Sequence, residues 1–179
     1  MTKLGRGWLL SQGNNGYHRA VNKSITEITM TGTFLTTSMT PELCCSNFKS
    51  SLSFYVELLG FKIQYQREHE GFAMLERQGS RIMLDEIRAN TVMGNKRVWI
   101  TAPMERPFGR GINLEIKTTQ VEQLYQVCEE SEATIFLPIE DKWYRAGNVE
   151  IGNRQFIVLD PDGYMLRFVG ELGVRHLSE

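Results

Sequence analysis

The chain of 179 residues has few of the residues that build disulfide-linked or metal-held folds. It contains three cysteines and three histidines. An odd cysteine count, with Cys44 and Cys45 adjacent, argues against a disulfide framework and favours a reducing, cytoplasmic location. The chain has no Cys-x-x-Cys pair, so a thiolate zinc site is not expected. No apolar run approaches the length of a membrane span, and Trp8–Leu10 is too short for a signal-peptide core.

An excess of charge of either sign is also absent. The formal net charge is −1, from 20 basic and 21 acidic residues. The charged residues before position 39 are Lys3, Arg6, Arg19, Lys23 and Glu27, so the rest of the chain is mildly acidic. Such a balance disfavours nucleic acid as a partner and suits a cationic small ligand.

The chain does contain an internal repeat. Phe72–Gly79 is matched by Phe156–Gly163, with Leu three residues and Gly seven residues after each Phe. An apolar strand follows each copy, and a strand, a helix and another strand precede it. This pattern predicts an α+β domain of two tandem βαβββ modules that form a curved mixed sheet around a cleft.

The repeat sets the predicted domain limits. Residues 39–179 are expected to form the domain, with modules at about 39–96 and 110–171. Residues 1–38 are rich in Gly, Asn, Thr and Ser, which predicts a poorly ordered or arm-like extension. The alternative for this extension is a swapped strand that covers a partner subunit.

In the first module, residues 41–45 read as a strand. Ser46 or Asn47 is expected to cap a helix whose apolar stripe runs from Phe48 to Leu59, and Gly60 to end it. Residues 61–65 alternate as a strand, and residues 71–87 form a hairpin. A further short strand is possible at residues 98–100.

In the second module, Ile112, Leu114 and Ile116 alternate with polar residues as in a strand. Thr119 and Glu122 fit a capping box for the next helix. Residues 135–137 predict a strand. Residues 143–145 read as an insertion that breaks the repeat, and residues 160–163 (Asp-Pro-Asp-Gly) as the turn of the last hairpin.

Four segments carry a resemblance to a known family: residues 46–55 (SNFKSSLSFY), 57–61 (ELLGF), 154–156 (RQF) and 160–164 (DPDGY). Over residues 39–171 the chain resembles the vicinal oxygen chelate superfamily, which includes glyoxalase I, extradiol dioxygenases, and bleomycin and fosfomycin resistance proteins. The resemblance implies the fold but does not by itself specify the chemistry.

Metal enzymes of this superfamily place His, Gln or Glu on four strands. The matching positions here are Thr40, Glu76, Gly111 and Arg167, of which only Glu76 ligates a metal well. Glu42 is a substitute carboxylate one pleat from Thr40. None of the three histidines falls at a matching position. We therefore expect no metal and no cofactor.

Within the superfamily, the chain most resembles the metal-free bleomycin resistance proteins. The resemblance implies a homodimer with two clefts at its interface, which sequesters a cationic drug and is not an enzyme. The expected function is metal-independent binding of a small amphiphilic molecule, such as a bleomycin-type antibiotic. The alternatives are a metal-dependent lyase, isomerase or dioxygenase of the same superfamily, and a binding module for a housekeeping metabolite.

A flat heteroaromatic ligand with a cationic tail needs aromatic faces and carboxylates. The predicted ligand-binding residues are Tyr65, Trp99, Trp143 and Tyr144 as faces, Glu42, Glu76 and Glu115 as carboxylates, and Asn113, Arg145 and Arg167. Arg167 is expected either to repel a cationic drug or to bind an anionic ligand. Replacing Trp143 by Ala is predicted to weaken ligand binding and leave the dimer intact.

Overall fold

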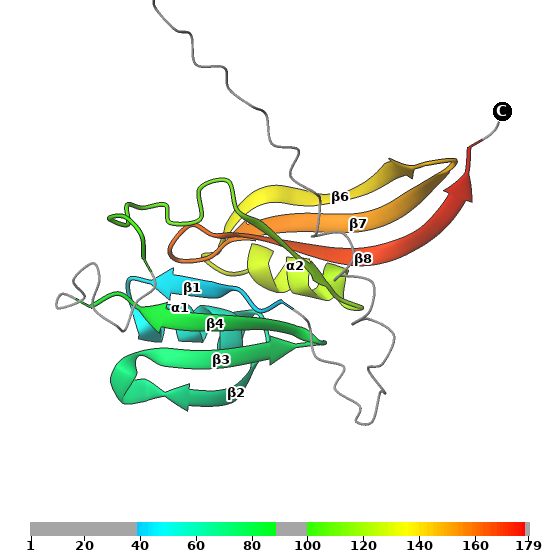
Figure 1. Ribbon diagram of the computed structural model, residues 1–179. Helices are drawn as coiled ribbons and strands as arrows, with labels where there is room; N and C mark the ends of the chain where they lie inside the picture. Colours follow the sequence, from blue (N-terminus) through cyan, green and yellow to red (C-terminus); the bar gives the residue numbers. More distant parts are fainter. Residues whose placement is uncertain (1–38, 89–99, 178–179) are drawn as a thin grey trace, which may run out of the picture. The chain divides into compact units, whose positions relative to one another are not determined.

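Two four-stranded mixed sheets form the framework of the computed structural model, which describes residues 39–88 and 100–177 (Figure 1). The strand order is β1-β4-β3-β2 in the first sheet and β5-β8-β7-β6 in the second. In each sheet the first pair is parallel and the other two pairs are antiparallel. The predicted α+β fold of two βαβββ modules is thus confirmed, with two open sheets rather than one continuous sheet.

The strands of the first module are short. Its elements are β1 (Glu42–Cys45), α1 (Phe48–Ser53), the π-helical turn η2 (Phe54–Leu58), β2 (Lys62–Arg67), the 3₁₀ turn η3 (Glu68–Glu70), β3 (Phe72–Arg77) and β4 (Ser80–Glu86). The Asn47 side chain accepts a hydrogen bond from the N–H of Ser50, which confirms the predicted cap. Gly60 has a φ of +71°, the left-handed conformation expected where a helix ends.

The last three strands of the second module, β6, β7 and β8, are much longer than those of the first. Its elements are β5 (Asn113–Lys117), α2 (Val121–Glu129), β6 (Thr134–Ala146), β7 (Val149–Leu159) and β8 (Met165–His176). Figure 1 shows β6, β7 and β8 as three long strands side by side. The described residues include no helix that is both long and apolar enough to cross a membrane.

Two local predictions for this module are wrong. The insertion expected at residues 143–145 is part of β6, where Trp143 pairs with Gly152 of β7. Two register irregularities in β6 break its alternation, which hid the strand in the sequence. The predicted capping box is also absent, because Gln120 is the N-cap residue and Glu122 instead accepts a hydrogen bond from Arg154.

Both modules contribute to one hydrophobic core. It includes Leu59, Leu75 and Leu84 of the first module and Phe156, Leu166 and Phe168 of the second, all fully buried. Tyr55 is also fully buried, and its hydroxyl donates to Asp160 of the second module at 3.0 Å. The shared core holds the two modules together and fixes the positions of the exposed surfaces of both sheets.

Some predictions lie outside the described residues. They concern the extension at residues 1–38, Trp99, and most of the short strand proposed for residues 98–100.

Candidate functional site

The second sheet has one face against α2 and the core and a second face turned away from them. Phe156 pairs with Phe168, and both are buried in the core. Since side chains alternate along a strand, the next pair, Gln155 with Val169, points the other way. We call this second side the outer face. Its members include Asn113, Glu115, Lys117, Tyr144, Ile151, Gln155, Ile157, Met165, Arg167, Val169 and Val174.

A charge pair lies on the outer face. Arg167 and Glu115 are neighbours across β8 and β5, and Nη2 of Arg167 donates to Oε2 of Glu115 at 2.6 Å. The Arg167 side chain is 24% exposed, and its Nε is buried without a hydrogen-bond partner among the described residues. An unpartnered buried donor is costly, so this guanidinium is suited to donate a hydrogen bond to a further acceptor.

A hydrogen-bond chain lies on the same face. Nε2 of Gln155 donates to Oε1 of Glu140 at 2.9 Å, and the Tyr144 hydroxyl lies 3.1 Å from Oε1 of Gln155. Gln155 is 3% exposed, whereas Tyr144 is 39% exposed. The buried amide therefore orients a tyrosine ring whose surface remains open to a ligand.

The structure brings together four of the predicted site residues on this outer face. They are Asn113, Glu115, Tyr144 and Arg167. Gln155 was not predicted as a site residue, although it belongs to the Arg-Gln-Phe segment that carries the family resemblance. Its role depends on contacts with Glu140 and Tyr144, more than ten residues away in the chain.

Trp143 and Arg145 belong to the opposite face of β6. The Trp143 ring lies where a side chain on Gly152 would be, and the Arg175 guanidinium sits 4.2 Å from the ring centroid. Arg145 donates through Nε to the carbonyl oxygen of Gly147. These two predicted residues therefore do not share a surface with Tyr144.

Three further predicted residues, Glu42, Tyr65 and Glu76, belong to the first sheet. The Tyr65 ring stacks on the Phe72 ring, with 5.9 Å between the ring centroids. The guanidinium carbon of Arg67 lies 3.9 Å from the centroid of the same Phe72 ring. Glu76 accepts a hydrogen bond from the N–H of Gly79. Glu42 lies on β1, opposite Met83 of β4. No hydrogen bond, ion pair or ring contact among the described residues joins Glu42, Tyr65 or Glu76 to the outer face of the second sheet.

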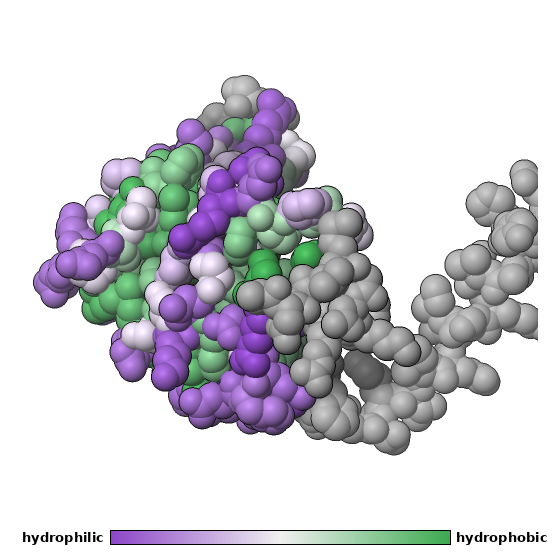
Figure 2. All heavy atoms as spheres, turned by 90° about the vertical axis from the view of Figure 1, so that its left-hand side faces the viewer, coloured by the Kyte–Doolittle hydropathy of each residue, from purple (hydrophilic) through white to green (hydrophobic). Residues whose placement is uncertain are grey.

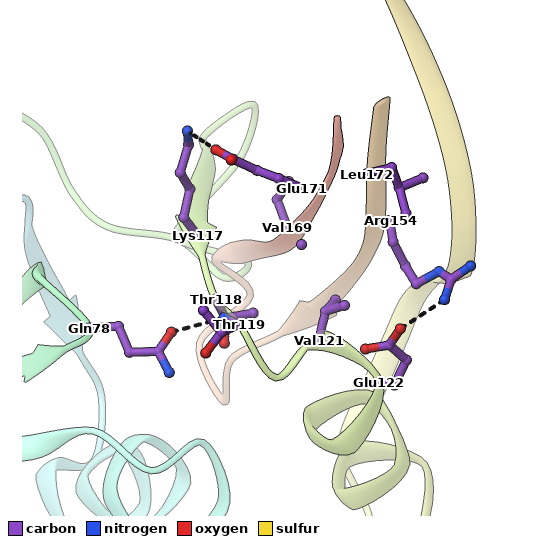
Figure 3. A pocket seen from close by; sticks show the side chains of 11 residues that line it. Gln78, Lys117, Thr118, Thr119, Val121, Glu122, Arg154, Val169, Glu171 and Leu172 are labelled. Carbon is purple, nitrogen blue, oxygen red and sulfur yellow. Dashed lines mark hydrogen bonds and ion pairs between the residues drawn. The ribbon is translucent and has the colours of Figure 1, made fainter. Parts of the chain in front are cut away.

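A cavity of about 750 Å³ opens beside the middle of β8, the end of β5 and the start of α2 (Figure 3). It is lined by Gln78, Lys117, Thr118, Thr119, Val121, Glu122, Arg154, Val169, Gly170, Glu171 and Leu172. Two ion pairs lie in it: Lys117 with Glu171 at 2.6 Å, and Arg154 with Glu122 at 2.8 Å. The bonds from Lys117 and Arg154 lower the pKa of Glu171 and Glu122, respectively. Sequence alone did not predict this cavity, because its residues come from distant segments.

The described residues contain no group of three or more His, Cys, Asp or Glu side chains arranged to hold a metal ion. His69 is on the exposed turn η3, with a side chain that is 81% exposed. Glu76, the one good ligand at a matching position, uses Oε1 to accept the N–H of Gly79. The histidine and carboxylate side chains of the described residues therefore do not converge on a common point where a metal ion could bind.

Comparisons with known proteins extend this description. A model of the Glyoxalase/Bleomycin resistance protein/Dioxygenase superfamily matches residues 37–168. A search of curated proteins found no match.

Several solved structures are similar to the chain. TioX from Micromonospora sp. ML1 is 19% identical with a TM-score of 0.55, over 79% of this chain and 99% of that one. An integron cassette protein from V. cholerae is 21% identical with a TM-score of 0.52, over 78% and 96% of the two chains. Both support the fold.

A third similar structure comes from the same superfamily. It is a superfamily member from Vibrio splendidus 12B01, 32% identical over 73% of this chain and 95% of that one, with a TM-score of 0.33. Since the family model spans most of the chain, the protein belongs to the Glyoxalase/Bleomycin resistance protein/Dioxygenase superfamily.

Proposed function

We propose that the protein binds and sequesters a small amphiphilic molecule without a metal ion, on the outer face of the second sheet. One observation carries the proposal: the outer face combines an oriented tyrosine, apolar strand residues and the Glu115–Arg167 charge pair. Together these groups provide a flat apolar surface and charges of both signs, the features that an amphiphile requires.

The apolar part of this face is substantial. Tyr144, Ile151 and Val174 pair across three strands and are 39%, 42% and 64% exposed. Figure 2 shows that hydrophobic residues also gather at the surface on the side of the molecule that it displays. An exposed row of apolar side chains on a sheet is typical of a surface that a ligand or a partner covers.

The proposal includes a homodimer. A single copy leaves Tyr144, Ile151 and Val174 of the outer face exposed, whereas a second copy placed against them would enclose a ligand and bury this apolar row. Light scattering coupled to size exclusion tests this directly. A dimer at micromolar concentration is expected, and a monomer whose ligand affinity is independent of protein concentration would overturn this part of the proposal.

The candidate ligand is a bleomycin-type antibiotic, and the expected compartment is the cytoplasm. The three free thiols fit a reducing compartment. Glu115, Glu140 and Glu171 are exposed carboxylates on or beside the outer face that suit the cationic tail of such a drug. Arg167 opposes it, so an amphiphile that carries an anionic group is the competing ligand class.

Isothermal titration of the full chain separates these ligand classes. Metal-free bleomycin and a flat aromatic carboxylate are titrated into wild type and Arg167→Gln. We expect the substitution to strengthen the binding of the cationic drug or to weaken that of the carboxylate. Saturable binding of neither probe would refute the proposed ligand chemistry.

A matched pair of tyrosine variants tests the location. Tyr144→Phe removes the hydroxyl that contacts Gln155, whereas Tyr125→Phe removes one that contacts Glu129 on α2. Ligand affinity should fall in Tyr144→Phe and stay at the wild-type value in Tyr125→Phe. Equal affinities in both variants and wild type would place the ligand elsewhere.

A further inference from the structure

Arg77 is a buried arginine at the end of β3. It is 8% exposed, its Nε donates to the carbonyl oxygen of Leu59 at 2.9 Å, and its Nη1 donates to Oγ1 of Thr118 at 2.8 Å. Its guanidinium carbon also lies 5.9 Å from the centroid of the Phe168 ring. The side chain thus links the end of η2 to the segment that enters α2.

The charge of Arg77 is not neutralised. Among the described residues, no carboxylate oxygen lies within ion-pair distance of its guanidinium, and Nη2 has no hydrogen-bond partner. Burial alone lowers the pKa of this group. An arginine stays protonated even so, and a largely buried cation without a counter-charge is unfavourable.

Arg77 lines a cavity of about 500 Å³ together with Gly60, Lys62, Glu76, Gln78 and Gln120. Lys62, which is exposed, has no ion pair with any carboxylate of the described residues. The one carboxylate in the lining, Glu76, has Oε1 bonded to the N–H of Gly79 at 2.6 Å. The lining therefore has two cations and one carboxylate.

Other groups in the lining also favour an anion. Gln78 and Gln120 supply side-chain amides, and Gln120 is the N-cap residue of α2, a helix of nine residues. The unpaired N–H groups in the first turn of a helix add partial positive charge at that end.

We infer that this cavity binds an oxyanion, the phosphate or carboxylate group of a small molecule, with Arg77 and Lys62 as its charged contacts. The oxyanion supplies the counter-charge that Arg77 lacks. Arg77 offers the free Nη2 at a fixed position, and Lys62 adds a mobile ammonium from the neighbouring strand. The inference is independent of the amphiphile site, whose charged pair is Arg167 and Glu115 on the second sheet.

The test is a titration of the full chain with inorganic phosphate and, separately, with succinate, at constant ionic strength. Binding is followed by NMR, using the side-chain amide signals of Gln78 and Gln120. Saturable shifts of these signals at millimolar anion are expected, and the probe that binds more tightly identifies the group. The absence of saturable shifts with both probes would overturn the inference.

Variants connect the binding to this cavity. Lys62→Gln should weaken the binding of the preferred anion by about three- to fivefold, which is the effect of removing one partly solvated charge. Lys49→Gln removes an exposed cation from α1 instead and should leave the affinity unchanged. Arg77→Lys retains the charge but loses the planar guanidinium, whose N–H groups donate in fixed directions. This substitution should weaken anion binding by about tenfold or more.

The stability of each variant is measured on the same samples. The preferred anion should raise the melting temperature of wild type and Lys49→Gln more than that of Lys62→Gln. Equal weakening in Lys62→Gln and Lys49→Gln would show only general charge attraction and would contradict a defined site. If Arg77→Lys fails to fold, the comparison of Lys62→Gln with Lys49→Gln still decides the question.

Discussion

In each module, the hairpin turn contacts the segment that enters the helix of the other module. Asp162, in the β7–β8 turn, accepts a hydrogen bond from the N–H of Ser46 just before α1. Gln78, at the equivalent place in the repeat, accepts one from the N–H of Thr119 just before α2. We call these two contacts the α1 seam and the α2 seam. Their geometry is duplicated, but their chemistry differs.

The α1 seam is acidic and internally bonded. Asp160 is 5% exposed and accepts bonds from the Tyr55 hydroxyl and from the N–H groups of Asp162 and Tyr164. Burial raises the pKa of Asp160 in spite of these bonds. Arg106 pairs with Asp162 at 3.1 Å and adds a cation from the linker. Asp160 is thus fully hydrogen-bonded, while Oδ1 of Asp162 is buried and has the ion pair with Arg106 as its one partner among the described residues.

The α2 seam is basic and incomplete. Arg77 occupies the place that Pro161 has in the other copy, and it has no counter-ion among the described residues. Gln78 of this seam lines both the cavity shown in Figure 3 and the cavity proposed to bind an oxyanion. The comparison indicates that one seam stabilises the pair of modules, while the other retains unsatisfied charge that a ligand can use.

Replacing the seam carboxylates should give the largest difference. Asp160→Ala removes the acceptor of three hydrogen bonds in a buried turn and should lower the free energy of unfolding by about 3–5 kcal/mol. Glu76→Ala, at the equivalent position of the α2 seam, removes one bond near the surface and should cost about 1 kcal/mol or less. Urea unfolding of both variants measures the difference. Equal losses would contradict the asymmetry of the seams.

Trp143 distinguishes packing from ligand binding on β6. Its contacts with Gly152 and Arg175 favour a loss of about 1–3 kcal/mol of stability in Trp143→Ala, because the residue is only partly buried. Ligand affinity should then stay at the wild-type value. Weaker binding with an unchanged melting temperature would instead support Trp143 as part of the ligand site, as expected from the sequence.

A smaller effect is expected from the hydroxyl of Tyr144. Removing it in Tyr144→Phe should weaken amphiphile binding by about 0.5–1.5 kcal/mol, because Gln155 then no longer fixes the ring. The phosphate response of the α2 seam should not change in the same variant. A parallel loss at both places would show that the two surfaces form one site rather than two.

The thiols report on how closed the α1 seam is. Burial raises the pKa of Cys45 to about 12 and that of Cys44 to about 11, and the nearby Asp162 and Asp85 carboxylates add to the increase. Alkylation requires the thiolate, so iodoacetamide should modify both slowly at neutral pH and faster as the pH rises. All three cysteines should react in urea. Rapid modification of Cys45 in the folded protein would show that the seam opens.

Local patterns predicted the repeat, a helix cap at Ser46 or Asn47, the Gly60 helix end and the Asp-Pro-Asp-Gly turn, since each depends on residues close in sequence. The long β6 was not predicted, because its two irregularities disrupt the alternation of its side chains. The α2 seam was not predicted either. It depends on Arg77 meeting Thr118, 41 residues further along the chain, and on a counter-ion being absent.

The candidate site was predictable in part for the same reason. Alternation on β5 and β8 placed Glu115 and Arg167 on one face, and the structure pairs them at 2.6 Å. The face of the second sheet on which Trp143 lies was not predictable, because it follows from the register between β6 and β7. The network of Gln155 with Glu140 and Tyr144 likewise requires that register.

Metal-independent binding is the central claim, and one combined measurement tests it most directly. The full chain is purified without chelators, its content of Mn, Fe, Ni and Zn is determined, and metal-free bleomycin is titrated in before and after dialysis against EDTA. We predict substoichiometric metal and the same saturable affinity in both titrations. A stoichiometric metal ion whose removal abolishes binding would contradict the claim and favour a metal-dependent enzyme of the superfamily.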